Sequence, residues 1–132
     1  MNFLRKGYLL EFSKGTLQKQ LYVYFTKPVN GMGPIMENLK EHLAFQVEIE
    51  KKGIMFAAGP HREKDREHEE DSWAGEGMII IRANSLEEAT KIAESDPMHS
   101  SGARSFTIKP WLMNEGKFSL EIDFSDREVK II

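Results

Sequence analysis

The chain has 132 residues, the length of a single domain. Apolar residues make up 40% and charged residues 30%, which excludes disorder throughout the chain. A net charge of −3 argues against general nucleic-acid binding, and the absence of cysteine excludes disulfides, thiol catalysis and cysteine-ligated metal centres. No apolar run approaches the ~20 residues that cross a bilayer, so we expect no signal peptide, no membrane association and a cytoplasmic protein.

The first half of the chain is predicted to form an arm, a strand and a helix. Residues 1–18 contain apolar side chains without a regular period, and we interpret them as an N-terminal arm. Residues 20–27 alternate in a β-branched and aromatic stretch that is typical of a strand. Residues 35–52 have the pattern of a helix, and Gly53 stands where a C-terminal cap is expected.

The second half is predicted to contain one helix and four strands. The helix, 86–94, begins with a capping box in which Ser85 precedes Glu88, and Asp96-Pro97 ends it. A polar loop occupies 60–76. The predicted strands are 54–59, 78–81, 105–109 and 118–124.

This order, β-α-β-β-α-β with an added C-terminal strand, predicts an α+β fold of the ferredoxin-like type, an antiparallel sheet with both helices on one face. The whole chain, 1–132, is expected to be one domain, with its core at 20–111 and a C-terminal extension at 117–132. Because 54–59 and 78–81 are apolar on both faces, the uncovered face must meet something. A second copy is the simplest candidate, which predicts a homodimer enclosing a cavity between two sheets.

A polar stripe crosses the apolar face of the first predicted helix. His42, Gln46 and Glu50 recur at i, i+4 and i+8 among apolar residues. A buried polar group needs a partner, since leaving it unpaired costs about 1–3 kcal/mol. His42 is therefore either a core histidine bonded to a backbone carbonyl or a titratable group of a site.

Several segments resemble the YciI-like (YCII-related) family. The matching sequences are Lys27-Pro28 after the first strand, His42 within ENLKEHLAFQVEIEKKG, FAAGP at 56–60, GMIIIRANSLEEA at 77–89, Asp96-Pro97, and Lys109-Pro110-Trp111. Each segment alone is weak evidence, but their order and spacing together are specific.

The resemblance implies a ferredoxin-like protomer that dimerises into an α/β barrel, with a site built from His42 and Asp96. One branch of the family is linked to dehydrochlorination of a chlorinated hydroxyquinol, and muconolactone isomerase uses a similar barrel. The N-terminal arm, the long charged loop and the sequence after Trp111 depart from the short family pattern.

A His–Asp pair has a coherent chemistry. Histidine titrates near neutral pH and can act as general base or acid. A carboxylate on one ring nitrogen would fix its tautomer and stabilise the imidazolium. The alternative for Asp96-Pro97, a helix stop followed by a turn, is compatible with this role.

Other candidates are substrate-binding residues around the same cavity: Tyr22, Tyr24, Gln46, His61, Arg62, His99 and Ser100. Aromatic packing at the dimer interface is the alternative for the two tyrosines. The loop that carries His61 and His68 fits no metal motif, and we interpret it as a solvated loop, with a substrate lid as the alternative.

Two functions remain open. The first is a cofactor-independent, metal-free enzyme that moves a proton on a small cyclic or aromatic acid, as a lyase, isomerase or dehalogenase. The second is a non-catalytic dimer that binds a small metabolite or supports a partner. Cofactor-free oxygenation would fit the same barrel, but no residue singles it out.

Overall fold

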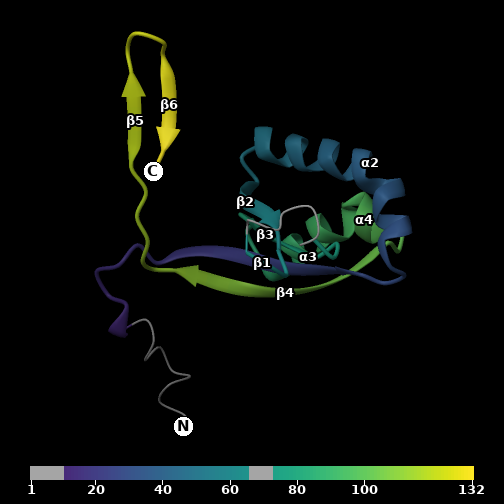
Figure 1. Cartoon of the computed structure of the whole chain (residues 1–132). Coiled ribbons are helices and arrows are strands. Elements are labelled where there is room, and N and C mark those ends of the chain that lie inside the picture. Colours follow the sequence, from purple (N-terminus) through teal and green to yellow (C-terminus); the bar gives the residue numbers. More distant parts are fainter. Residues whose placement is uncertain (1–10, 66–72) are drawn as a thin grey trace. The chain divides into compact units, whose positions relative to one another are not determined.

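The computed structural model describes residues 11–65 and 73–132, and these residues divide into two units. The larger unit runs from Gln20 to Trp111, and the smaller one combines the chain up to Lys19 with the chain from Leu112 onward. Figure 1 shows the chain coloured along the sequence, with the strands and helices labelled.

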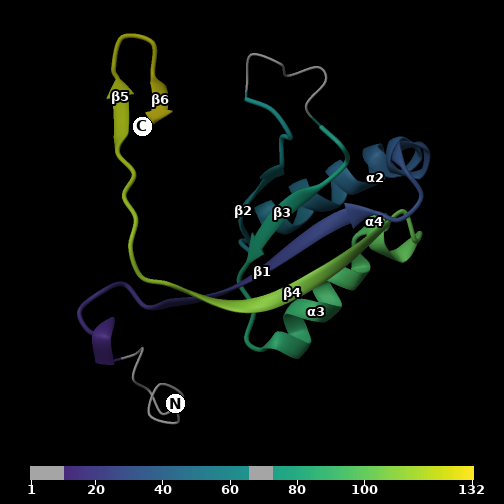
Figure 2. The same ribbon diagram turned by 60° about the horizontal axis from the view of Figure 1, so that its bottom comes forward.

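The larger unit is an α+β domain with one four-stranded antiparallel sheet (Figure 2). Its strands lie in the order β2-β3-β1-β4, which confirms the predicted ferredoxin-like fold. The elements are β1 (Lys19–Pro28), α2 (Met32–Lys51), β2 (Met55–Pro60), β3 (Gly77–Ile81), α3 (Leu86–Ser95), α4 (Pro97–Ser100) and β4 (Arg104–Met113).

Both long helices pack on one face of the sheet, here called the helix-covered face. Tyr22 and Tyr24 of β1 form the core there with Ile79 and Ile81 of β3. The helices contribute to the same cluster through the buried side chains Ile49, Ala89 and Ala93.

The opposite face, here called the open face, is apolar as predicted at its centre. A shallow hollow of about 230 Å³ on it is lined by Val23, Phe25, Met78, Ile80 and Trp111. β2, predicted to be a strand that is apolar on both faces, is exposed in the single chain. It is an edge strand whose residues from Phe56 to Pro60 are exposed, with a register irregularity between Met55 and Ala57.

The buried stripe of α2 is narrower than the sequence pattern suggested. Ile35, His42 and Ile49 are its buried residues, whereas Leu43 and Val47, which belong to the apolar face in the sequence pattern, are half exposed. The exposed residues of the predicted arc also include Met36 and Glu50. These three buried residues recur at every seventh position and so follow one stripe along the helix.

Two element boundaries differ from the prediction for stereochemical reasons. α2 begins at Met32 rather than at residue 35, because Pro34 falls in the first turn, where its missing N–H is not needed. β4 continues through Pro110 because it is an edge strand, and an edge position tolerates the lost donor.

The caps around α3 follow the predicted pattern. Ser85 Oγ accepts a hydrogen bond from the Glu88 N–H at 3.1 Å, and Glu88 Oε2 accepts one from the Asn84 N–H at 2.8 Å. The short helix α4 directly after Asp96 was not predicted.

The smaller unit contains a separate hairpin of β5 (Leu120–Asp123) and β6 (Glu128–Ile131). The predicted strand at 118–124 therefore exists in part, but it pairs with β6 rather than joining the four-stranded sheet, and all its residues are exposed. Alternation in a sequence shows that a strand is amphipathic without identifying its partner. Residues 1–10 of the predicted arm lie outside the described residues. None of the helices described reaches the length and apolarity needed to cross a membrane.

Candidate functional site

His42 and Asp96 meet in the interior of the larger unit. The Nδ1 atom of His42 lies 2.8 Å from Asp96 Oδ2 and 2.9 Å from Asp96 Oδ1. His42 is 6% exposed and Asp96 0% exposed. The partner of His42 is thus a carboxylate and not the backbone carbonyl of the alternative interpretation.

Asp96 is held in place by the chain that follows it. Its Oδ1 atom accepts a hydrogen bond from the Met98 N–H at 2.9 Å and so caps the N-terminus of α4. The residue also ends α3 with an extended backbone. Asp96 is therefore both a helix stop and the partner of His42, and the cap orients its carboxylate toward the imidazole.

This contact fixes the tautomer of a neutral His42. A carboxylate can only accept, so Nδ1 carries the proton and Nε2 keeps its lone pair. Nε2 makes no hydrogen bond with any residue in 11–65 or 73–132. The arrangement leaves one oriented nitrogen that can accept a proton and a carboxylate that stabilises the resulting imidazolium.

A cavity of about 210 Å³ lies beside His42. Leu39, Leu43 and Gln46 of α2 line it on the helix side, and Ile79 lies on the sheet side. Its other lining residues are Gly59, Pro60, Trp73, Glu76, Gly77 and Arg104. Gln46, predicted to bind substrate, thus lines the same cavity as His42.

Tyr22 and Tyr24 occupy positions different from those considered in the sequence. Both lie on the helix-covered face, neither lines the cavity beside His42, and neither faces the open face where a second sheet could pack. The Tyr24 hydroxyl is buried and has no hydrogen-bond partner among the described residues. Burial, aided by the negative charge of Asp96, raises the Tyr24 pKa, so the phenol stays protonated.

His99 is half-buried, and two hydrogen bonds fix its ring. Its Nδ1 donates to the Ala93 carbonyl at 2.6 Å, and its Nε2 accepts from the Thr26 hydroxyl at 2.9 Å. Its ring also packs on Phe106, with 4.5 Å between the centroids. His99 does not line the cavity beside His42, and Ser100 is exposed at the end of α4.

The remaining predicted residues lie near the open face or on the surface. His61 lines a second hollow of about 240 Å³ together with Phe25, Lys27 and Thr107. Arg62 is exposed. The part of the predicted loop that includes His68 lies outside the described residues.

Arg104 and Trp73 are among the lining residues of the cavity that were not predicted from the sequence. Arg104 shares a face of β4 with Phe106 and Ile108, which pack on the core. A charged residue on a strand face that is otherwise apolar resembles the pattern of His42, a polar residue on an apolar helix face. It was overlooked because the strand was predicted to begin one residue later. Trp73 was considered only as a loop residue.

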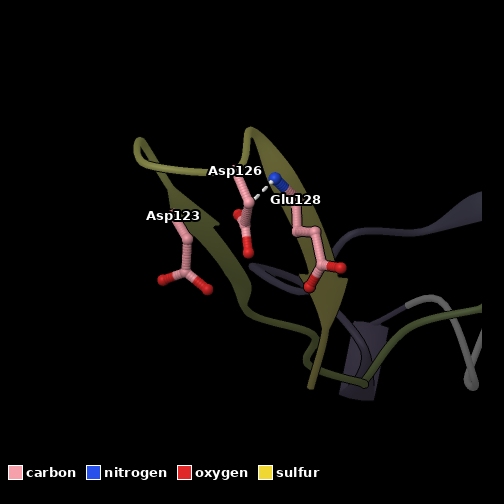
Figure 3. A group of neighbouring side chains, drawn as sticks. All are labelled: Asp123, Asp126 and Glu128. Atoms are coloured by element: carbon pink, nitrogen blue, oxygen red, sulfur yellow. Dashed lines mark hydrogen bonds between the residues drawn. The ribbon is translucent and has the colours of Figure 1, made fainter.

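Three acidic side chains come together at the tip of the β5–β6 hairpin (Figure 3). Potential ligand atoms of Asp123, Asp126 and Glu128 lie within 4.8 Å of one another, and all three residues are exposed. One carboxylate is already used in the turn, because Asp126 Oδ1 accepts a hydrogen bond from the Glu128 N–H at 2.9 Å. Exposed acidic turns of this kind are common, and we assign no metal to this one.

Comparison with known proteins agrees with this fold. The YCII-related domain family matches residues 21–112. A stretch of 39 residues is 44% identical to the uncharacterized protein YjpA of Bacillus subtilis (strain 168), covering 30% of this chain and 46% of that protein. The chain thus spans less than half the length of that curated relative.

A solved structure with a similar fold is 5-chloro-2-hydroxyhydroquinone dehydrochlorinase (TftG) from Burkholderia phenoliruptrix AC1100, in complex with 2,5-dihydroxybenzoquinone. It superposes with a TM-score of 0.57 at 20% identity, over 69% of this chain and 92% of the neighbour. At that identity the likeness concerns the fold. The family match covers most of the larger unit, and the chain therefore belongs to the YCII-related family.

Proposed function

We propose that the chain is an enzyme in which His42 moves a proton on a small cyclic or aromatic acid without a cofactor. The observation that carries this proposal is the state of the imidazole: Nδ1 is held by buried Asp96, and His42 lines a cavity with Nε2 unoccupied. A general base must lie within hydrogen-bond reach of the proton that it removes. In this proposal Nε2 takes a proton from a phenolic or enolisable group, and Asp96 stabilises the imidazolium until the proton is returned or released.

The size and lining of the cavity support a small ligand. Its volume of about 210 Å³ is below the ~300–1,000 Å³ of typical drug-sized sites. Apolar side chains of α2 and β3 line much of it, with Gln46 as a polar group beside His42. A single ring with polar substituents suits that combination. The fold neighbour is named for acting on such a ring, which supports a lyase or dehalogenase type of reaction here.

We also propose that the working unit is a cytoplasmic homodimer formed through the open face. The apolar hollow there, lined by Val23, Phe25, Met78, Ile80 and Trp111, would otherwise remain in water. Light scattering after size exclusion should give near twice the 15.2 kDa of one chain. The Ile80→Lys variant should be monomeric, whereas Val129→Lys in the separate hairpin should leave the mass unchanged. A monomeric wild-type protein would contradict the dimer.

The test of activity uses the neighbour's compounds as probes. The purified protein is mixed with 5-chloro-2-hydroxyhydroquinone, and chloride release and the absorbance of the quinone product are followed in time. Binding of 2,5-dihydroxybenzoquinone is measured in parallel by calorimetry. Chloride release above the buffer rate supports the enzyme.

The alternative is a non-catalytic dimer that binds a small metabolite. Tight binding of the quinone without turnover of any phenolic or enolisable acid tested would favour it. The same cavity serves both functions, and only the proton-transfer role of Nε2 separates them.

A further inference from the structure

A buried cation lines the cavity beside His42 without a charged partner in contact. Arg104 is 6% exposed, and its guanidinium makes no hydrogen bond or ion pair with any residue of 11–65 or 73–132. Its Nε atom is among the buried polar atoms that lack a partner. Its contact is the Trp73 ring, whose centroid lies 5.8 Å from the Arg104 Cζ atom.

Burying the Arg104 guanidinium in this way is unfavourable in free energy as long as no ligand is bound. Burying an ionised group costs free energy unless hydrogen bonds and an opposite charge compensate it. The ring face of Trp73 compensates only in part, since a cation–π contact supplies less than a bidentate carboxylate. Burial lowers the Arg104 pKa, and the charge of Asp96 opposes that shift, but a guanidinium remains protonated at neutral pH.

The nearest competing explanation is an internal ion pair. Glu76 lines the same cavity, and its carboxylate makes no ion pair with Arg104 in the structure. The backbone carbonyl of Glu76 instead accepts the Trp73 indole N–H at 2.9 Å. This bond holds the Trp73 ring over which the guanidinium lies, so the backbone of Glu76 supports the position of Arg104. The carboxylate of Glu76 leaves the guanidinium available to a ligand.

We propose that Arg104 binds an anionic oxygen of a small planar aromatic ligand in this cavity, beside the ring of Trp73. Five fixed N–H donors suit a carboxylate or a phenolate, and both are anionic oxygens on a ring. His42 would then face a second position of the same ring. Binding of the ligand requires no turnover. This inference rests on the proposed function only where it takes the bound ligand to be the substrate.

The experiment measures charge preference with two probes of equal shape. 4-Hydroxybenzoate and 4-hydroxybenzamide are titrated into the full-length protein by calorimetry, and the Trp73 indole resonance reports whether the cavity is occupied. Wild-type protein should bind the carboxylate about 10- to 100-fold more tightly than the amide, the range expected for a charge-assisted hydrogen bond. The affinity for phenol is then compared with the affinity for 4-hydroxybenzoate. This comparison tells whether the ring hydroxyl or the carboxylate is the oxygen that the protein prefers.

Variants assign the preference to one side chain. Arg104→Met should bind both probes equally, and Arg104→Lys should keep a reduced preference because it retains charge without the planar fork. Glu76→Gln should strengthen binding of the carboxylate only. Arg82→Met is the matched control, since Arg82 lies outside the cavity and donates to the Gly53 and Met55 carbonyls. It should leave the preference unchanged.

Stability gives an independent readout. If Arg104 serves a ligand, Arg104→Met should melt at the same temperature as the ligand-free wild type or higher, because an uncompensated buried charge is removed. A marked loss of melting temperature in both Arg104→Met and Arg104→Lys would assign it a structural role and overturn the proposal.

Two binding results would also overturn it. One is a carboxylate preference that survives in Arg104→Met, and the other is no preference in the wild type, undetectable binding included. Failure of turnover, by contrast, would count against the proposed enzyme and leave the charge preference intact.

Discussion

His42 and His99 lie close enough to Asp96 for its charge to act on both, yet the hydrogen-bond partners of the two rings differ. Each ring has its proton on Nδ1, held by a carboxylate in His42 and by the Ala93 carbonyl in His99. The Nε2 atom of His99 is already bonded to the Thr26 hydroxyl. The Nε2 atom of His42 has no such partner among the described residues, and His42 lines a cavity.

The difference teaches that residue type alone does not separate the histidine proposed to move a proton from one that has a structural role. What separates them is whether the second nitrogen is left unsatisfied beside a space that a ligand can occupy. By that criterion His99, predicted to bind substrate, has both ring nitrogens satisfied, whereas Arg104, which was not predicted, lines the same cavity as His42.

The largest expected effect comes from exchanging each histidine for glutamine. In His42→Gln the amide can still donate to Asp96, so the fold should survive, but turnover should fall about 10²–10⁴-fold because the amide cannot take the proton from the substrate. In His99→Gln the amide can replace both hydrogen bonds, and turnover should stay within a few-fold of wild type. Initial rates and melting temperatures of the two variants test the comparison. Equal loss of turnover in both would remove the distinction between them.

How far the sequence could go is clear from the same two residues. The stripe of His42 and Gln46 identified a polar group inside an apolar helical face, and the family resemblance added Asp96. No one-dimensional pattern indicates that Thr26, a strand residue 73 positions before His99, supplies a hydroxyl to its ring. Hydrogen bonds between distant elements depend on the register of the sheet, and register follows from packing.

The fold was more predictable than the site for a physical reason. Helix caps and strand alternation are local, so the order of elements in the larger unit could be derived from residues near one another. The partner of the 118–124 strand, the short helix α4 and the edge position of β2 depend on tertiary arrangement, and these were the points at which the prediction was wrong or incomplete.

A smaller effect is expected from Asp96→Asn, which sharpens the role of the carboxylate. The asparagine oxygen can still cap α4 by accepting the Met98 N–H, so the helix should remain. Its NH₂ group can only donate to the imidazole, so His42 must move its proton to Nε2 and loses its base. Turnover should fall by about 10²-fold or more, with a modest change in stability.

Nitrogen NMR of the His42 ring checks the cause of that loss. Wild-type protein should show a protonated Nδ1, and Asp96→Asn a protonated Nε2, whereas the His99 ring should keep its tautomer in both proteins. An unchanged His42 tautomer in the variant would mean that Asp96 does not orient the ring.

The smallest expected effect concerns pH and stability at His99. Burial lowers the His99 pKa below its ordinary value, although the bond to the Ala93 carbonyl and the charge of Asp96 oppose the shift. Between the lowered pKa and the ordinary value of about 6.5, the unfolded chain binds more protons than the native one. Stability should therefore rise with pH through that window and be lost on acidification, by at most about 1.4 kcal/mol per pH unit for one proton.

Urea unfolding of wild type and His99→Gln at pH values from 5 to 8 isolates this contribution. The two proteins differ only at residue 99 and share the charged groups that act on it, Asp96, Arg104 and His42. The wild type should lose more stability than the variant as the pH falls, and the two curves should run parallel above pH 7. Parallel curves across the whole range would mean that His99 titrates alike in the native and unfolded chains. Its two hydrogen bonds would then no longer distinguish a neutral structural ring from the ring of His42, which is proposed to move a proton.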